Sequence, residues 1–248
     1  MTASAPQKNS ELPGVFDLLR TTFEVYRTNF SLLFGFAAWL LLPVAISFFA
    51  SLSLEPNIAL IIQIIALLVV YPVISIWIAL AIIFLVPDLL AKKPPRLNDL
   101  NARIRRAAIP FFLTVIIVNL VQIGGLLALI VPGIIFSVWF AFPSIIVVLE
   151  QKNIIEAFKI SKRLSKERFW YVFWLLFGAV IAFISFYIVL TGTVSLVFAV
   201  IAGGDFVAYL ESGPSLGEQA ITQIFDIFFF PLILIYTTVL YLTLKKKT

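Results

Sequence analysis

The 248-residue sequence contains neither cysteine nor histidine, and both absences exclude chemistry. Without cysteine the chain cannot form a disulfide, a thiolate nucleophile or a cysteine metal site. Without histidine it cannot build a Ser-His triad, a histidine acid–base pair or a His-ligated zinc site. The 13 acidic residues are scattered along the chain. We therefore expect no catalytic residues, no metal or cofactor site and no enzymatic activity.

Charge is scarce as well: charged residues make up 12% of the chain and hydrophobic residues 62%. The mean hydropathy is +1.09. Soluble domains are about half apolar and about a quarter charged, and a soluble core of this size could not bury so many large apolar side chains. The net charge is +5, but the charged residues lie between apolar runs and do not form a soluble basic domain. This distribution indicates anionic lipid headgroups or membrane topology, and not nucleic acid. The sequence predicts an all-α polytopic membrane protein.

The length of the apolar runs predicts the number of spans, because about 20 apolar residues cross a bilayer core about 30 Å thick. The run 107–149 is too long for one span, and Val131-Pro132-Gly133 within it is typical of a turn. The run 58–91 contains Tyr71-Pro72 but is too short for two spans and a turn. After the polar segment 1–14, which lacks the features of a signal peptide and is expected to be a disordered tail, we predict one membrane domain over 15–248. Its six spans are 30–54, 58–91, 108–131, 133–149, 169–202 and 221–244.

The basic residues orient these spans. With the N-terminus inside, all 18 Lys and Arg residues fall in cytoplasmic segments. The predicted outer loops hold four acidic residues and no basic residue: Glu55, Asp205, Glu211 and Glu218. Such segregation follows the positive-inside rule, and splitting the run 58–91 would destroy it. We expect a multi-pass protein of the cell (plasma) membrane with both termini in the cytoplasm.

A basic amphipathic segment precedes each odd-numbered span, at 15–29, 97–108 and 153–166. In the third, Asn153 and Glu156 resemble a capping box. The pattern predicts three interfacial helices, each followed by a hairpin, although side-chain identity between the three units is weak. Their bases either bind anionic lipid or a partner, or only set the orientation. The candidate headgroup contacts are Arg103, Arg105, Arg106, Lys159, Lys162, Arg163 and Lys166.

The apolar faces of two of these helices follow from helical spacing. The first comprises Val15, Leu19, Phe23, Tyr26 and Phe30. The third comprises Ile154, Ala157, Phe158, Ser161 and Leu164, opposite Lys159, Lys162, Arg163 and Lys166.

Four polar residues are candidates for a role inside the membrane: Asp226, Asn119, Gln122 and Gln63. An ionisable group in a span is costly and therefore a functional candidate. Asp226 either faces lipid in its neutral form or faces the bundle, where it could bond Asn119, Gln122 or a hydroxyl, or carry protons or cations. The three amides are expected to form hydrogen bonds between helices, worth about 1 kcal/mol each.

Acids and glycines near the span ends have simpler explanations. Asp88 and Glu150 are expected to pair with nearby bases, Lys92 and Lys152, or to lie at the interface. Gly124, Gly125 and Gly178 are expected to allow helices to approach closely.

Short motifs relate the chain to a known family. They are Pro132-Gly133-Ile134, Glu156-Ala157-Phe158-Lys159-Ile160-Ser161 with Leu164, Arg168-Phe169-Trp170, and Thr238-Val239-Leu240-Tyr241. Together they resemble the membrane domain of glycerophosphoryl diester phosphodiesterases and the related six-span bacterial membrane proteins of unknown function. The resemblance covers most of the chain, but Tyr241 is followed by Leu242-Thr243-Leu244-Lys245 and not by the Asp-Leu-Arg-like ending common in that family.

The resemblance implies a membrane anchor or regulatory module. In the enzymes a separate soluble barrel performs hydrolysis with histidines, which this sequence lacks. Two functions are therefore predicted from different classes. The first is a non-catalytic module that anchors, scaffolds or regulates and interacts with lipid or with a membrane-protein partner. The alternative is a small transporter or channel, which would need buried charges and broken helices.

Overall fold

The computed structural model describes residues 13–201 and 215–246, which are helical throughout apart from short connections. Most of the predicted tail lies outside these residues. So do Lys8 and Lys247 of the predicted cytoplasmic segments and Asp205 and Glu211 of the predicted outer loops.

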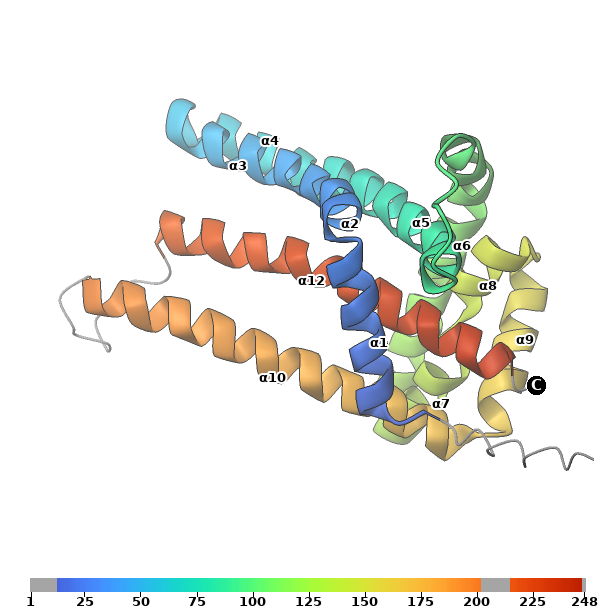
Figure 1. The fold of residues 1–248 in the computed structure, drawn as a ribbon. Coiled ribbons are helices and arrows are strands. Elements are labelled where there is room, and N and C mark those ends of the chain that lie inside the picture. The colour runs from blue at the N-terminus through green and yellow to red at the C-terminus, as the bar shows by residue number, and fades with distance from the viewer. Residues whose placement is uncertain (1–12, 202–214, 247–248) are drawn as a thin grey trace, which may run out of the picture.

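Six helices among the described residues are long and apolar enough to cross a membrane, which confirms the predicted number. They form three hairpins in chain order (Figure 1). The first hairpin consists of two spans. Its first span comprises α2 (Phe30–Ala37), a 3₁₀ turn (Ala38–Leu40) and α3 (Leu41–Ser53). Its second span comprises α4 (Pro56–Ile65), a π-helical segment (Ala66–Val70) and α5 (Tyr71–Leu90). The second joins α6 (Leu100–Ala128) to α7 (Ile130–Trp139) and α8 (Pro143–Glu150), and the third pairs α10 (Phe169–Ile201) with α12 (Leu216–Lys245).

The second span is one helix from Pro56 to Leu90, as the length argument predicts. Tyr71-Pro72 does not interrupt it. The backbone instead widens into the π-helical segment just before Tyr71, where the Tyr71 N–H donates to the Ala66 carbonyl.

The turn between the third and fourth spans lies earlier than predicted. It is a single extended residue, Leu129 (φ −170°, ψ 153°), while Pro132 and Gly133 belong to α7. Glycine is needed beside this turn because a Cβ on Gly133 would lie 2.5 Å from the Leu126 side chain, and one on Gly125 would lie 2.7 Å from Phe136. The proline-glycine pair therefore serves helix contact and not the turn. Gly124 faces open space, so its predicted role is wrong.

The fourth span is broken between α7 and α8, which the sequence did not indicate. The Ser161 hydroxyl of α9 (Ile154–Lys166) donates to the Trp139 carbonyl at 2.7 Å and accepts the Phe142 N–H at 3.2 Å. A break inside a span is tolerated where freed backbone groups find such partners. Ser161 thus stabilises the bend with one side chain.

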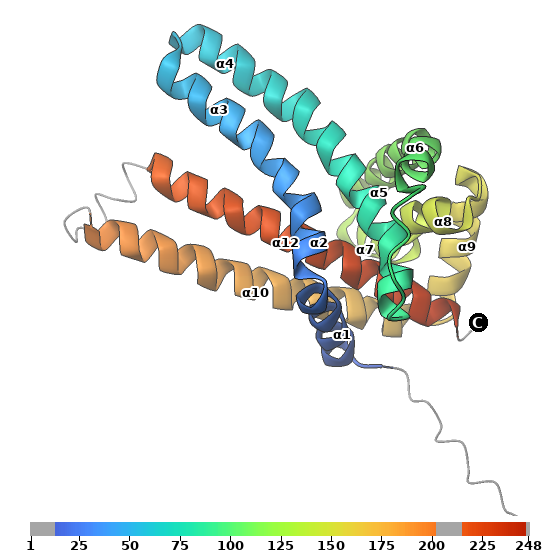
Figure 2. The same ribbon diagram turned by 45° about the horizontal axis from the view of Figure 1, so that its top comes forward.

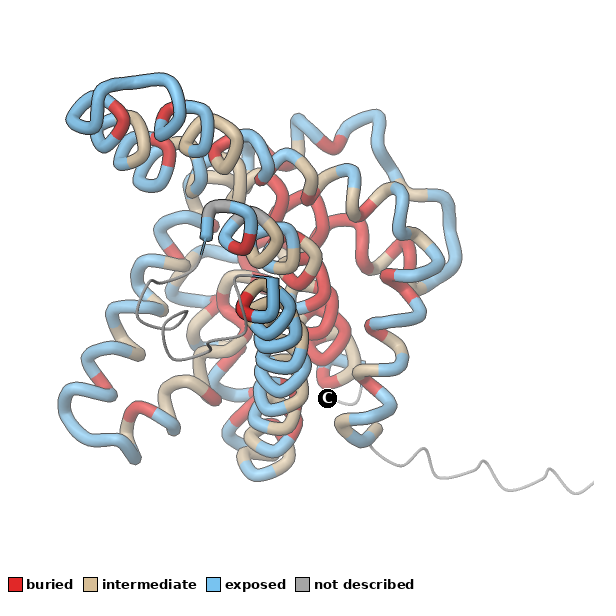
Figure 3. The backbone as a smooth tube through the Cα atoms, turned by 90° about the vertical axis from the view of Figure 1, so that its left-hand side faces the viewer, coloured by how far each residue is buried: buried red, intermediate tan, exposed pale blue. Residues whose placement is uncertain are grey.

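The helices pack closely at one end and separate toward the other. In Figures 1 and 2 the α3–α4 hairpin diverges from the α10–α12 hairpin, and in Figure 3 exposed hairpins project around a buried centre. Apolar side chains such as Leu80, Ile146 and Leu240 are fully buried in that centre. At the hairpin tips Leu127 is 82% and Ile130 72% exposed. We call the packed part, formed by α1 (Val15–Thr28), the second half of α5, the first turns of α6 and α10, α8, α9 and the second half of α12, the basic end.

All Lys and Arg residues of the described chain belong to the basic end, its connections or the start of α6. The α3–α4 turn, the α6–α7 turn and the facing ends of α10 and α12 are the tips of hairpins that project from the packed centre (Figure 3). We call these tips the far end and the helix halves that lead to them the far half.

Two amphipathic helices pack on the bundle at the basic end. α9 begins with the predicted cap, in which the Asn153 side chain accepts the Glu156 N–H at 2.9 Å. The predicted face of α9 is buried at Ala157, Ser161 and Leu164, against α7 and α8.

The predicted face of α1 is partly wrong. Leu18 and Tyr26 are buried, whereas Phe23 is 54% exposed. α1 packs mainly on α12 and also contacts α10 and α5, and it therefore buries a different, neighbouring stripe. Gly178 of α10 allows this contact, because a Cβ there would lie 2.9 Å from Val15.

Candidate functional site

The acids at the basic end are paired, but with other bases than those nearest in sequence. Asp88 accepts a hydrogen bond from Arg96 at 3.3 Å and not from Lys92. Glu150 contacts Lys245 at 2.7 Å and accepts a hydrogen bond from the Tyr241 hydroxyl. The Glu150 contacts tie the end of α8 to the end of α12, whereas the Asp88–Arg96 pair joins α5 to the connection that follows it.

A basic pocket of about 160 Å³ lies between α5, α6 and the end of α8. Arg103 and Arg106 face it from the first turns of α6, because residues three apart share one side of a helix. The Arg103 guanidinium lies 4.2 Å above the Phe84 ring of α5, a cation–π contact that holds its position. Lys152 closes the pocket from the α8–α9 connection. Arg105 does not line it.

The chain reaches this position through a left-handed residue. Gln151, which ends α8, has φ 53° and ψ 33°, a region that costs a non-glycine residue about 1–2 kcal/mol. The turn places Gln151 and Lys152 against the pocket wall beside Val147. Backbone of this kind persists only where the surrounding structure holds it.

An apolar groove of about 880 Å³ adjoins the basic pocket and shares Pro110, Gln151 and Lys152 with it. On α6 its wall is a stripe of residues at helical spacing, Ile109, Leu113 and Ile117. The start of α9 forms the other wall. The two cavities together form one site with a charged end and an apolar extension.

The bases of α9 differ in their surroundings. Lys159 lines the apolar groove. Lys162 lies 4.5 Å above the Trp139 ring. Arg163 and Lys166 are exposed to solvent. Of the seven predicted headgroup contacts, the structure therefore places Arg103, Arg106 and Lys159 at this site.

α1 adds a buried polar pair to the basic end. The hydroxyls of Thr22 and Tyr26, one helical turn apart, are buried with no hydrogen-bond partner among the described residues. Burial raises the pKa of Tyr26 to about 12, so its phenol stays neutral at physiological pH. The ring meets Phe228 of α12 edge to face at 5.1 Å between centroids. Tyr26 therefore acts as a packing residue.

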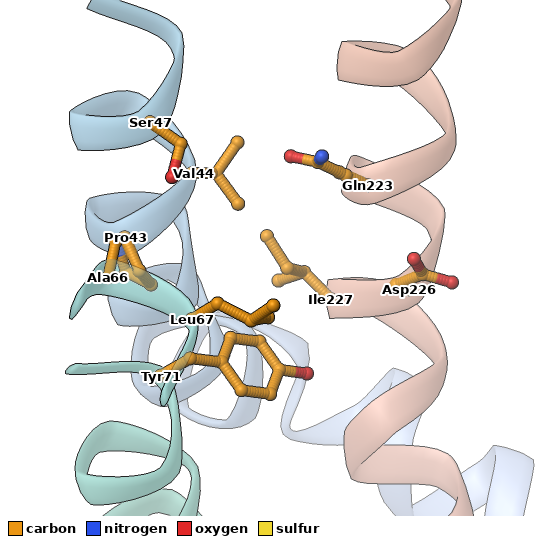
Figure 4. A pocket seen from close by; sticks show the side chains of 9 residues that line it. All are labelled: Pro43, Val44, Ser47, Ala66, Leu67, Tyr71, Gln223, Asp226 and Ile227. Atoms are coloured by element: carbon orange, nitrogen blue, oxygen red, sulfur yellow. The ribbon is translucent and has the colours of Figure 1, made fainter. Parts of the chain in front are cut away.

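A second, polar groove lies in the far half between α3, the π-helical segment and α12 (Figure 4). Gln223 and Ile227 point into it from α12, toward Ser47 and Tyr71. The Asp226 carboxylate is turned away from these side chains, and the Tyr187 hydroxyl of α10 is its neighbour. An adjoining cavity of about 500 Å³ is lined by Gln63 as well.

The predicted intramembrane residues therefore separate into two groups. Gln63 and Asp226 line neighbouring cavities of the polar groove. Asn119 and Gln122 belong to α6, which packs mainly on α5, α7 and α8. The Asn119 amide donates to the Val115 carbonyl of its own helix at 2.8 Å, so its predicted bond between helices is wrong.

Sequence reasoning missed Phe84, Gln151 and Lys152 as members of the basic pocket. Lys152 carried the correct charge but was assigned to Glu150. Nothing in local spacing indicates that Phe84 lies under Arg103, because that contact depends on how α5 and α6 cross.

Comparisons of this chain with protein-family models, curated proteins and solved structures give no match. The resemblance to the phosphodiesterase membrane domain accordingly stays a prediction from the quoted motifs.

Proposed function

We propose that this chain is a non-catalytic membrane module whose basic end holds anionic lipid, as an anchor, scaffold or regulator. The observation that carries the proposal is the gathering of the described Lys and Arg residues at one end of six apolar helices. Each base near a membrane surface attracts anionic lipid by about 1 kcal/mol. Arg105, Arg106, Arg163 and Lys166 are exposed there.

The proposal also places the protein in the plasma membrane. Both of its termini would lie in the cytoplasm. This orientation is supported by the positive-inside rule, which places bases on the cytoplasmic side. The absence of histidine and cysteine supports a role without catalysis. A membrane-protein partner is compatible with the same surface, and nucleic acid is not proposed.

Lipid enrichment around the full-length protein tests this function. The protein is extracted in nanodiscs from membranes of mixed phosphatidylcholine and phosphatidylglycerol, and the retained lipid is compared with the bulk. We expect enrichment of phosphatidylglycerol that declines as salt rises, because exposed charges are screened. Retained lipid of bulk composition at low salt would contradict the proposal.

The polar groove favours a second candidate, a small transporter. π-helical segments are frequent at functional sites, and one lines this groove beside Tyr71. Proteoliposomes with an internal pH dye and an imposed potential distinguish the two functions. If the protein is the lipid-binding module, the proton flux of its proteoliposomes should equal that of protein-free liposomes. Proton flux in the wild type that Asp226→Asn abolishes, with folding intact, would favour the transporter.

A further inference from the structure

We propose that the basic pocket and the adjoining apolar groove form a binding site for one anionic phospholipid. Its phosphate would lie among Arg103, Arg106 and Lys152, and one acyl chain would follow α6 past Ile109, Leu113 and Ile117. The inference rests on the proposed function and assigns it to a defined site.

The charge of the pocket fits a phosphate. Its charged lining residues are Arg103, Arg106 and Lys152, and no acid lines it among the described residues. Asp88 is paired with Arg96, and Glu150 is paired with Lys245, although Glu150 also interacts with Lys152. Glu156 lies 3.9 Å from Lys152 in an exposed ion pair, which is worth little. Basic pockets between membrane helices at this interface are suited to phosphorylated headgroups.

The direction of the groove fits the acyl chain. The pocket lies at the start of α6, and the groove continues along the same helix toward the far end. From Arg103 to Ile117 the axis advances about 20 Å, at about 1.5 Å per residue. A phospholipid at the interface has the same arrangement, with its phosphate at the surface and its chain toward the bilayer centre.

The walls of the groove favour lipid over a protein segment. Ile109 is 70% and Ile155 69% exposed, so the groove opens laterally at the height of the first turns of the span. The α6 side of the groove is apolar, and its other side carries Lys152, Glu156 and Lys159. An occupant that is apolar beside α6 and anionic at the pocket end fits this lining. A phospholipid meets both conditions.

Native mass spectrometry of the full-length protein in detergent tests the site, with dioleoylphosphatidylglycerol, dioleoylphosphatidylcholine and inorganic phosphate as probes. The double variant Arg103→Gln/Arg106→Gln removes two bases of the pocket. Arg163→Gln/Lys166→Gln is the matched control, because it removes equal charge from exposed positions of α9. Thermal unfolding of each variant reports folding.

We expect the wild type to retain one phosphatidylglycerol in preference to phosphatidylcholine. The pocket variant should bind it about 30-fold more weakly, because it loses two charge-assisted contacts to the phosphate, which the exposed bases of α9 do not make. The control should change affinity less than threefold. If the control weakens binding as much as the pocket variant, the site is wrong while the lipid-binding function stands. If the wild type shows no preference for the anionic lipid, both proposals fail.

A groove variant separates lipid from free phosphate. Leu113→Trp places a large ring in the apolar groove at a position that is 43% exposed, so folding should persist. It should lower phosphatidylglycerol binding at least fivefold and leave phosphate binding unchanged. If inorganic phosphate competes fully with the lipid and Leu113→Trp leaves phosphatidylglycerol binding unchanged, the site binds anions without a contribution from the acyl chain. That result would contradict the phospholipid site. Should the pocket variant fail to fold, Arg106→Gln/Lys152→Gln replaces it, since both side chains are exposed.

Discussion

The basic end and the far half of this protein are built from similarly apolar helices but are held together differently. At the basic end Leu80, Ile146 and Leu240 are fully buried, whereas at the α6–α7 tip Leu127 is 82% and Ile130 72% exposed. Lipid covers apolar surface as well as protein does, so hydrophobicity alone does not bring membrane helices together. Packing at the basic end coincides with polar contacts between elements.

Those contacts come from a few side chains. The Tyr236 hydroxyl of α12 donates to the Leu175 carbonyl of α10 at 2.7 Å, and the Tyr171 hydroxyl donates to the Pro13 carbonyl at 2.8 Å. Ser161 joins α9 to the break between α7 and α8. Among the described residues of the far half, the Ser195 hydroxyl donates to Glu218 at 2.6 Å between α10 and α12. The hydrogen bonds at the basic end join elements in the part of the bundle where the helices pack closely.

The largest expected effect concerns the sidedness of the two regions. Single cysteines at Asn57 and at Lys166, in this chain without native cysteine, should be labelled by an impermeant maleimide from opposite faces of the membrane. Asn57 lies at the α3–α4 turn and Lys166 at the end of α9. Labelling is measured in intact and in permeabilised cells. Reaction of both positions from one side would end the six-span topology.

Next in size is the loss of the Ser161 hydroxyl. Ser161→Ala leaves the Trp139 carbonyl and the Phe142 N–H without their partner, which should lower the free energy of unfolding by about 3 kcal/mol. Ser165→Ala on the same helix is the control, because that hydroxyl is buried without a partner among the described residues. It should be neutral or stabilising. Unfolding in mixed micelles measures both, and equal effects would contradict the role of Ser161.

A smaller loss is expected where the far half packs closely. Gly133→Ala brings a methyl group within 2.9 Å of the Leu126 Cα atom and should destabilise the protein by about 2 kcal/mol. Gly124→Ala meets open space and should stabilise by about 0.5–1 kcal/mol through helix propensity. The same unfolding assay applies. Tolerance of Gly133→Ala would show that the α6–α7 hairpin is as loose as the rest of the far half.

The smallest effect is expected at Asp226. Its side chain is exposed, and asparagine keeps most of its hydrogen-bonding capacity, so Asp226→Asn should change the free energy of unfolding by less than about 0.5 kcal/mol. Asp226→Leu, which would destabilise the bundle modestly if the carboxylate had a structural role, should be equally tolerated at an exposed position. A loss above about 2 kcal/mol for Asp226→Asn would show that the carboxylate holds α10 and α12 together.

Candidate site residues were predictable to different degrees. Arg103 and Arg106 could be named as headgroup contacts, because a basic segment before a span must lie near the interface. Arg105, in the same segment, could not be distinguished from them without the crossing of α5 and α6. Gln63 and Asp226 were marked as polar residues inside spans, but their neighbours depend on how the hairpins diverge.

The sequence by itself determined the all-α membrane class, the six apolar helices, the gathering of bases at alternate connections and the cap of α9. These features depend on composition, run length and local spacing, which neighbours in the chain specify. The tertiary structure decided the turn at Leu129, the break that Ser161 stabilises, the buried stripe of α1 and the joining of the basic pocket to the groove on α6. Each of these results from contacts between helices, and in a lipid solvent an apolar surface carries no signal that distinguishes a helix neighbour from an acyl chain.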